Sequence, residues 1–352
     1  MLQTIPSLFQ KKQLEAFLVT YPANITYLTG FTGLSPDEEE CIVILSVEKP
    51  PALVFPRLYQ EEVQQLKKSL SLHPATGRSS LFDEVVVLIK KSSWTRIGFE
   101  AEHLSVARHQ WLQKKLSGIQ LVPESGLIED VRVIKTEEEI RFLEKAQRIT
   151  VKTYETIQKT LHAGQTEQEI AFRMQQLLYE YGAEGSSFDP IVAGGPHSAV
   201  PHHKTGNRKI ASGDIVLLDF GARYKGYCAD ITRTFMLGNP TDRFLKIQQL
   251  VERAYETSLA TIQLGKTGKE VYQSAWRVFE KNGVALQFLH GLGHGVGVQI
   301  HERPYLKATV VETLKEGMVL TVEPGLYFPG WGGVRYENVV VVEGTGARVV
   351  GV

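Results

Sequence analysis

Apolar residues in the first third of the chain occur both in short runs and at helical spacing. The short runs, bounded by turn-forming residues, predict strands at Leu14–Thr20, Cys41–Ser46, Ala52–Phe55, Val85–Ile89 and Arg96–Glu100. Apolar positions three and four residues apart predict helices at Gln60–Lys68 and His103–Leu116. We therefore expect an α/β domain over residues 1–124, ending near the turn-rich segment VPESG.

Helix-start signals repeat in residues 125–352. Thr136 followed by Glu139 is a capping box, which predicts a long amphipathic helix reaching His162. The segments AGQTEQEI (163–170) and LGKTGKEV (264–271) carry the same signal, and Gly182 and Gly283 follow them at equal distance as expected helix ends. We therefore predict a pseudo-symmetric domain whose halves each contribute strands to a shared sheet.

Composition agrees with an ordinary globular protein. A length of 352 residues favours two domains, and 43% hydrophobic with 22% charged residues excludes a disordered chain. The 39 basic and 39 acidic residues balance, which argues against nucleic-acid and anionic-membrane partners. We expect a soluble cytoplasmic protein for three reasons. The sequence has only two cysteines, it shows no signal-peptide pattern, and no apolar run approaches the roughly 20 residues of a membrane span.

Residues 214–237 have the pattern of a β-hairpin that carries two aspartates. Its arms and turn are expected at Ile215–Phe220, Tyr227–Phe235 and Arg223–Gly226. A turn centred between Tyr224 and Lys225 would place Asp219 directly opposite Asp230. Two bare carboxylates so placed repel each other, and a cation is the simplest remedy. Aspartates that face solvent are an equally acceptable interpretation of this hairpin alone.

Two glutamates interrupt apolar strands later in the chain. Glu323 lies in LTVEPGLYF and Glu337 in GVRYENVVVV, with the turn-rich PGWGG between them. A buried carboxylate without a partner costs several kcal/mol, so burial at these positions requires a compensating charge. Exposure at the surface is the alternative for either glutamate, and it suits Glu337 less because valines follow it.

A histidine completes the candidate ligand set. His294 is flanked by glycines at 291, 293, 295 and 297, which permit close backbone approach, and the segment lacks a phosphate-loop pattern. Four carboxylates and one imidazole are the ligand types expected for a pair of divalent metals. Two such ions about 3.5–4 Å apart can activate water for hydrolysis. The candidate ligands are Asp219, Asp230, His294, Glu323 and Glu337.

Several motifs together resemble one peptidase family. SFDPIVAGGPHSAVPHH, LLDFGARYKGYCADITRTF, GLGHGVGVQIHERP, TVEPG and GVRYEN occur in the order found in prolidases and Xaa-Pro aminopeptidases, and AFLVTYPANITYLTGFTG resembles their accessory domain. The resemblance implies an α+β protein of two domains. A smaller α/β creatinase-type domain at 1–124 would precede a pseudo-twofold pita-bread domain at 125–352.

The resemblance also implies roles for individual residues. It implies two divalent ions, Mn, Co or Zn, with Asp219 chelating one ion, Asp230 and Glu337 bridging both, and His294 and Glu323 binding the other. Glu323 would also be the proton shuttle. By the same resemblance His202 contacts the substrate near the scissile carbonyl, His301 helps to stabilise the tetrahedral intermediate, and Arg335 holds the acidic ligands. His290 and Arg303 are further candidates near the substrate. A prolidase must capture the carboxylate on the product side, for which Arg303 is a candidate, and a solvated loop arginine is the alternative.

The implied activity is hydrolysis of the Xaa-Pro bond in dipeptides or short peptides by a homodimer. A broader aminopeptidase of the same fold and a non-catalytic binding protein are the alternatives. His203, Gly291 and the Gly195–His197 segment depart from the family pattern at the expected substrate rim, so they bear on specificity.

Overall fold

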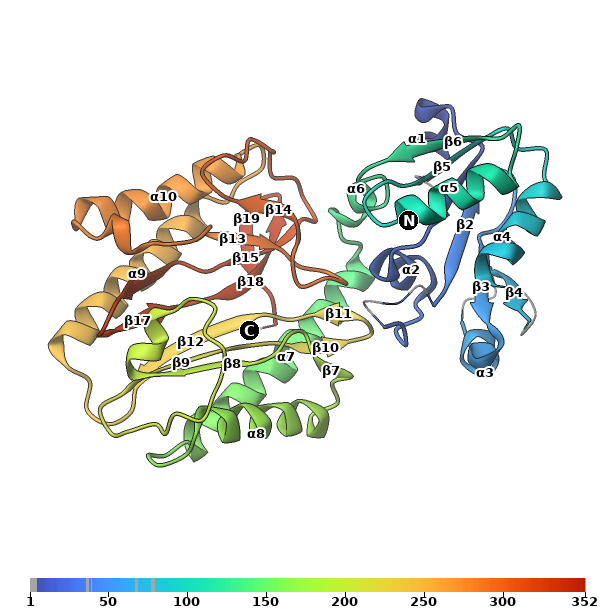
Figure 1. Cartoon of the computed structure of the whole chain (residues 1–352). Helices are drawn as coiled ribbons and strands as arrows, with labels where there is room; N and C mark the ends of the chain where they lie inside the picture. The colour runs from blue at the N-terminus through green and yellow to red at the C-terminus, as the bar shows by residue number, and fades with distance from the viewer. Residues whose placement is uncertain (1–4, 36–37, 39, 67–68, 77–79, 352) are drawn as a thin grey trace. The chain divides into compact units, whose positions relative to one another are not determined.

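The chain divides after Arg132 in the computed structural model, whereas the turn-rich VPESG segment led us to expect a boundary after Glu124 (Figure 1). Strand β6, Gln120–Glu124, and helix α6, Glu129–Arg132, are counted with the first unit. The structure describes residues 5–35, 38, 40–66, 69–76 and 80–351.

The first unit is built on a six-stranded mixed sheet in the order β4-β3-β2-β1-β5-β6. Its other strands are β1 Ala16–Val19, β2 Ile42–Ser46, β3 Ala52–Pro56, β4 Ser71–Ala75 and β5 Arg96–Glu100. Its other helices are α1 Ile5–Lys12, α2 Pro22–Thr29, η1 Arg57–Tyr59, α3 Gln60–Gln64, α4 Leu81–Lys90 and α5 Val106–Lys115. The buried carboxylate of Glu100 anchors the start of α2, because it accepts hydrogen bonds from the backbone N–H groups of Thr20 and Tyr21 at 2.6 and 2.7 Å.

The strand predicted at Val85–Ile89 is wrong, because this segment lies in helix α4. Ser80 and Asp83 form a capping box at its start. The buried side chains are Phe82, Val85, Val86 and Ile89, whose spacing places one apolar stripe against the core. The helix-start signal and this packing together outweigh the strand preference of the valines.

The other predicted elements of this unit are present with shifted ends. The four remaining strand predictions correspond to β1, β2, β3 and β5. Helix α3 ends at Gln64, and Lys67 and Lys68 of the predicted helix lie outside the described residues. Helix α5 begins at Val106 instead of His103, because the Ser105 side chain caps it by accepting a hydrogen bond from the backbone N–H of Arg108.

The second unit confirms the predicted repeat, but its halves form separate sheets and not the shared sheet that we expected. Its long helices are α7 Glu137–Thr160, α8 Glu167–Glu180, α9 Asp242–Thr261 and α10 Gly268–Lys281. The capping boxes at Thr136, Thr166 and Thr267 are all formed. Gly182 and Gly283 follow α8 and α10 with φ of 94° and 70°, as expected for glycines that end helices.

The strands of the second unit follow the same order in each half. In the first half the strands β8 Ile191–Gly194, β9 Ile215–Phe220 and β12 Ile231–Met236 form the sheet β12-β9-β8. A second small sheet, β11-β10-β7, consists of β7 Gly185–Ser186, β10 Ala222–Tyr224 and β11 Tyr227–Cys228. In the second half β13 Gly293–Gly295, β15 Val319–Val322 and β18 Asn338–Glu343 take the corresponding places, flanked by β14 Glu302–Leu306 and β19 Gly346–Val349. The strands β16 Gly325–Phe328 and β17 Gly332–Arg335 form a separate pair. Short 3₁₀ turns, η2 Gly195–Ala199 and η3 Ala285–Gln287, complete the halves.

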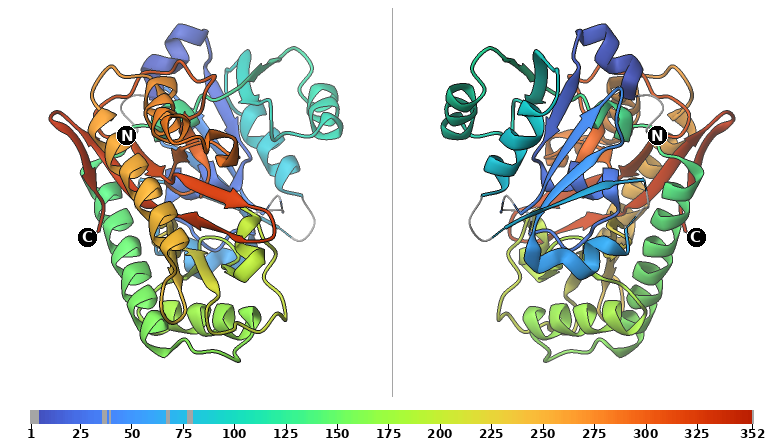
Figure 2. Two further views of the ribbon diagram at one scale, coloured as in Figure 1. Left: turned by 90° about the vertical axis from the view of Figure 1, so that its left-hand side faces the viewer. Right: turned by 90° about the vertical axis from the view of Figure 1, so that its right-hand side faces the viewer.

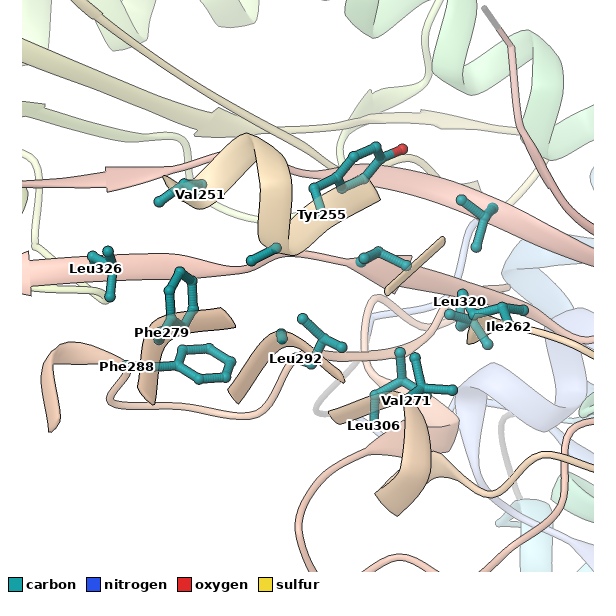
Figure 3. Close-up of a cluster of buried hydrophobic side chains, with 14 of the residues drawn as sticks. Val251, Tyr255, Ile262, Val271, Phe279, Phe288, Leu292, Leu306, Leu320 and Leu326 are labelled. Atoms are coloured by element: carbon teal, nitrogen blue, oxygen red, sulfur yellow. The ribbon is translucent and has the colours of Figure 1, made fainter. Parts of the chain in front are cut away.

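The two halves meet at one seam, which positions the site described below. The backbone N–H of Glu337 donates to the carbonyl of Thr232 at 3.2 Å, joining the edge of β18 to β12. Helices α9 and α10 cover the second half through a buried core that includes Val251, Phe279 and Leu320 (Figure 3). Strand β19 lies beside α7, where Arg348 pairs with Glu144 at 3.0 Å (Figure 2). Among the described residues, no helix combines the length and apolar character needed to cross a membrane.

Candidate metal centre

Asp219 and Asp230 lie on one hairpin, but not directly opposite each other. Lys225 and Gly226 form the turn with φ of 51° and 77°, which centres it one residue later than predicted. Asp219 therefore pairs with Thr232, and the predicted Asp219–Asp230 pairing is wrong. A two-residue shift keeps a side chain on the same face of the sheet, so both carboxylates still point to one site. Asp230 stands in a break just before β12, where Gln147 of α7 binds its backbone.

Glu323 and Glu337 occupy matching breaks in the second hairpin. Glu323 separates β15 from β16, and Glu337 lies just before β18 as Asp230 lies just before β12. The pairings of Val322 with Asn338 and of Gly325 with Arg335 keep one register, which places Glu323 opposite Glu337. The backbone N–H of Glu323 donates to the Leu292 carbonyl at 2.8 Å, so the break is held towards β13.

His294 projects from β13 with one ring nitrogen already committed. Its Nδ1 is 3.1 Å from the carbonyl oxygen of Gly295, so Nδ1–H donates and Nε2 keeps its lone pair. Nε2 lies 3.5 Å from Glu323 Oε1 and 3.7 Å from Asp230 Oδ2, which is too far for good hydrogen bonds and suits atoms that surround a shared ion. A side chain at Gly293 would collide with the Thr321 carbonyl, so this approach requires glycine.

Asp219, Asp230 and Glu337 are buried, Glu323 is half-buried, and this arrangement raises the pKa values of all four carboxyl groups. Burial raises the pKa of Glu323 to about 7, against the opposing charge of Arg335. Burial and neighbouring carboxylates raise the pKa values of Asp230 and Glu337 well above their usual range. Asp219 Oδ1 and Asp230 Oδ1 are buried without a hydrogen-bond partner. Asp230, His294 and Glu337 offer ligand atoms within 4.8 Å of one another, so the donor set fits divalent metal ions.

Arg335 donates hydrogen bonds to one of the carboxylates and to two hydroxyl groups beside the site. Its Nη2 donates to Asp219 Oδ2, its Nε to Thr232 Oγ1 at 2.9 Å and its Nη1 to the Tyr327 hydroxyl at 2.7 Å. The Tyr327 hydroxyl in turn lies 2.8 Å from His290 Nε2, and His290 Nδ1 lies 2.6 Å from the Gly291 carbonyl. Burial, reinforced by the Arg335 charge, lowers the pKa of His290 to about 3, so His290 is neutral and accepts from Tyr327.

A cavity of about 440 Å³ opens over these groups. It is lined by all five candidate ligands and by His202, His290, His301 and Arg335, together with Phe188, Ile191, Pro201, Gly291, Gly293, Ile300, Tyr305 and Lys307. The rings of His301 and His294 are 4.4 Å apart in an edge-on contact. Burial lowers the pKa of His301, which favours a neutral imidazole beside the ligands.

The structure does not bring Arg303 into this cavity. Its guanidinium pairs with Glu312, with Nη2 2.7 Å from Oε1, and it is absent from the cavity lining. Sequence reasoning also missed Tyr327, Tyr305 and Lys307. A signal for the last two was available, because both follow His301 closely: Tyr305 lies in the next strand, and Lys307 comes just after that strand.

Family comparisons agree with this geometry. Residues 1–134 match the Creatinase/Prolidase N-terminal domain, and residues 141–344 match Metallopeptidase family M24. The chain belongs to the M24 metallopeptidases. Its second unit is accordingly the pita-bread domain, and its first unit is the creatinase-type N-terminal domain.

Relatives of this M24 metallopeptidase span almost its whole length. An Xaa-Pro dipeptidase from Pyrococcus furiosus is 33% identical over 347 residues, covering 99% of this chain and 96% of the relative. The structure of an Xaa-Pro dipeptidase from Bacillus anthracis has a TM-score of 0.93 at 33% identity, covering 99% of this chain and 96% of that one. An X-Pro aminopeptidase from Thermotoga maritima has a TM-score of 0.91 at 29% identity, covering 98% and 97%.

Proposed function

We propose that this M24 metallopeptidase hydrolyses the Xaa-Pro bond of Xaa-Pro dipeptides or of short peptides that begin with Xaa-Pro, using two divalent metal ions. The observation that carries the proposal is the gathering of four carboxylates and His294 at one cavity, in which Asp219 Oδ1 and Asp230 Oδ1 are buried without a hydrogen-bond partner. Buried anions without partners are costly, and cations supply the missing interaction. The Xaa-Pro dipeptidases and X-Pro aminopeptidase similar to this chain supply the substrate class.

The ligands fall into three positions under this proposal. Asp219 would bind one ion, Asp230 and Glu337 would bridge both, and His294 with Glu323 would bind the other. The bridging pair stands at equivalent breaks of the two halves, on either side of the seam. Manganese, cobalt or zinc would suit this mixture of carboxylates and imidazole.

The chemistry follows from the positions of the side chains. Bound divalent ions would activate a water molecule and polarise the scissile carbonyl. Glu323 accepts the proton of the attacking water on a carboxylate oxygen and delivers it to the proline nitrogen. His202 and His301 donate hydrogen bonds to the carbonyl oxygen as negative charge develops on it. Arg335 keeps Asp219 oriented throughout.

A metal-reconstitution assay tests this function. Chelated protein should leave an Xaa-Pro dipeptide uncut, and addition of Mn²⁺, Co²⁺ or Zn²⁺ should restore release of proline. A matched Xaa-Ala dipeptide measures the preference for proline, because a broader aminopeptidase would cut both. Folded, metal-loaded protein that cuts no Xaa-Pro peptide would contradict the proposal and indicate a binding protein. Light scattering tests the homodimer that we include in the proposal.

A further inference from the structure

A second cluster of side chains that can bind a metal lies outside the cavity described above. It consists of Glu167 at the start of α8, His197 in η2 and His203 in the loop that follows η2. One ligand atom of each residue lies within 4.8 Å of those of the other two. None of the three is among the described residues that line the cavity of about 440 Å³. This cluster is therefore separate from the proposed two-ion site.

Glu167 supplies a buried carboxylate whose orientation is fixed. Its side chain has no exposed surface, although it is the first residue of the helix. The backbone N–H of Gly194 donates to Oε1 at 2.9 Å, and that of Gly206 donates to Oε2 at 3.2 Å. Each oxygen keeps a further lone pair, because a carboxylate oxygen can accept two hydrogen bonds. Hydrogen bonds of this kind orient a carboxylate for a metal ion.

The two histidines each direct one ring nitrogen at this carboxylate. His197 Nδ1 lies 2.8 Å from Glu167 Oε1 and His203 Nε2 lies 3.0 Å from Oε2, with the ring centres 4.4 Å apart. Ligand atoms about 2.0–2.1 Å from a tetrahedral zinc ion lie about 3.3–3.4 Å apart, so an opening of about half an ångström admits the ion. His197 Nε2 and His203 Nδ1 form no hydrogen bond with a described residue. Each ring can therefore carry its proton there while the other nitrogen coordinates.

Charge and access both favour a cation at this cluster. In the described part of the chain, only the two histidines pair with the Glu167 carboxylate, and the neighbouring Arg208 pairs with Asp214 at 2.7 Å. A neutral imidazole leaves the charge of a buried carboxylate uncompensated, which is costly. The His197 side chain is 42% exposed, so an ion can enter from its side. Water can then occupy a fourth ligand position.

We propose that Glu167, His197 and His203 bind one Zn²⁺ ion in addition to the two ions of the proposed two-ion site. Two imidazoles and a carboxylate suit zinc, whereas Mn²⁺ binds such a ligand set least tightly of the first-row divalent ions. The ion joins α8 to the segment that carries His202, since His203 follows His202 directly. It holds this segment and takes no part in hydrolysis, so the inference does not depend on the proposed function. Both histidines lie where the sequence departs from the family pattern, which makes the site a feature of this chain.

Zinc titration of a chain without the two-ion site tests this proposal. Metal-free Asp230→Asn/His294→Ala should bind one Zn²⁺ per chain by calorimetry, and Zn²⁺ should raise its Tm. Adding His197→Gln or His203→Gln should weaken this binding by more than about 100-fold and abolish the rise in Tm. Glutamine still offers Glu167 a side-chain N–H but gives zinc no imidazole nitrogen. The change therefore separates coordination from hydrogen bonding.

The zinc content of the chain with an intact two-ion site gives a second measurement. After reconstitution with Zn²⁺, the wild type should hold three ions per chain and His203→Gln two. The exposed His162→Gln is the matched control and should hold three. If the two-ion site fails to form, the wild type should hold one ion that His203→Gln loses, so failure of the proposed function is distinguishable from failure of this site.

Two results would overturn the proposal. One is that Asp230→Asn/His294→Ala binds no zinc while circular dichroism shows that it is folded. The other is that its zinc affinity is unchanged by His197→Gln and by His203→Gln. Either result would show that Glu167 and the two histidines form a hydrogen-bonded cluster without a metal ion.

Discussion

Glu323 and Glu337 face each other across a break in one hairpin, whereas Asp219 and Asp230 are offset by two residues on theirs. The two halves of the repeat therefore contribute unequal acidic pairs. Glu337 corresponds to Asp230, since each directly precedes the returning strand, but Glu323 lies two positions further along its strand than Asp219. This inequality lets Glu323 lie next to His294 Nε2 while Asp219 lies next to Arg335.

The pH dependence of stability tests the burial of Glu323. A carboxyl group whose pKa is raised from 4.5 to about 7 holds its proton more tightly in the folded protein. Its contribution to stability is present below about pH 4.5 and is lost as pH rises through about 7. The histidines with lowered pKa values, His290 and His294, act in the opposite direction, so wild type should be compared with Glu323→Gln.

Urea unfolding of chelated protein at about pH 5 and about pH 8 gives the measurement. The advantage of Glu323→Gln over wild type should grow at the higher pH, by up to about 3 kcal/mol. The exposed Glu316→Gln should show an equal difference at both pH values. A constant difference for Glu323→Gln would show that this carboxyl ionises normally.

Substitution of single ligands tests the donor set. Asp219→Asn and His294→Ala should abolish turnover, because each removes a ligand atom from the centre of the site. The exposed His162→Ala is the matched control and should keep its activity. Circular dichroism should show folded proteins throughout. Near-normal rates for either ligand variant would refute its assignment.

Much of the fold of the second unit, residues 133–352, can be predicted from the sequence because its local signals are strong. The capping boxes at Thr136, Thr166 and Thr267 fix helix starts within one residue, and the repeat they mark is present. The register of the hairpin that carries Asp219 and Asp230 cannot be predicted to that accuracy. Gly226 favours the turn at Lys225–Gly226, but Lys225 adopts a positive φ that lysine seldom takes, so the residue types specify the position of this turn only weakly.

Residues outside each segment explain what the composition of the segment alone could not show. Val85–Ile89 has the composition of a strand, and it is helical because its neighbours Phe82 and Ser80 complete an apolar stripe and a cap. Arg303 is adjacent to the site in sequence, but Glu312 holds it elsewhere. Tyr327 joins Arg335 to His290 only because the hairpin β16–β17 brings residues 327 and 335 together.

Tyr327→Phe tests that network. The change leaves His290 Nε2 without its donor and removes one acceptor from Arg335, which should cost about 1–3 kcal/mol of stability. Because Arg335 also orients Asp219, metal affinity should fall by about 10–100-fold. Metal titration followed by tryptophan fluorescence would measure the affinity, and the exposed Tyr179→Phe is the control. Unchanged metal affinity would show that the hydrogen bonds of Tyr327 do not contribute to metal binding.

His301→Ala and His202→Ala test the stabilisation of the carbonyl oxygen. Neither residue is assigned as a metal ligand, so metal content should be unchanged while kcat falls by about 10²–10³. Metal analysis and steady-state rates on one preparation would measure both quantities. Loss of bound metal in either variant would instead make that histidine a ligand.

The most direct measurement is a titration of Mn²⁺ into chelated protein with bound metal and proline release from an Xaa-Pro dipeptide recorded together. The two-ion site predicts that activity rises with occupancy and reaches its plateau at two ions per chain, and that Asp230→Asn, which removes a bridging ligand, abolishes this rise. Full activity in the chelated protein, or two bound ions without cleavage, would contradict the account.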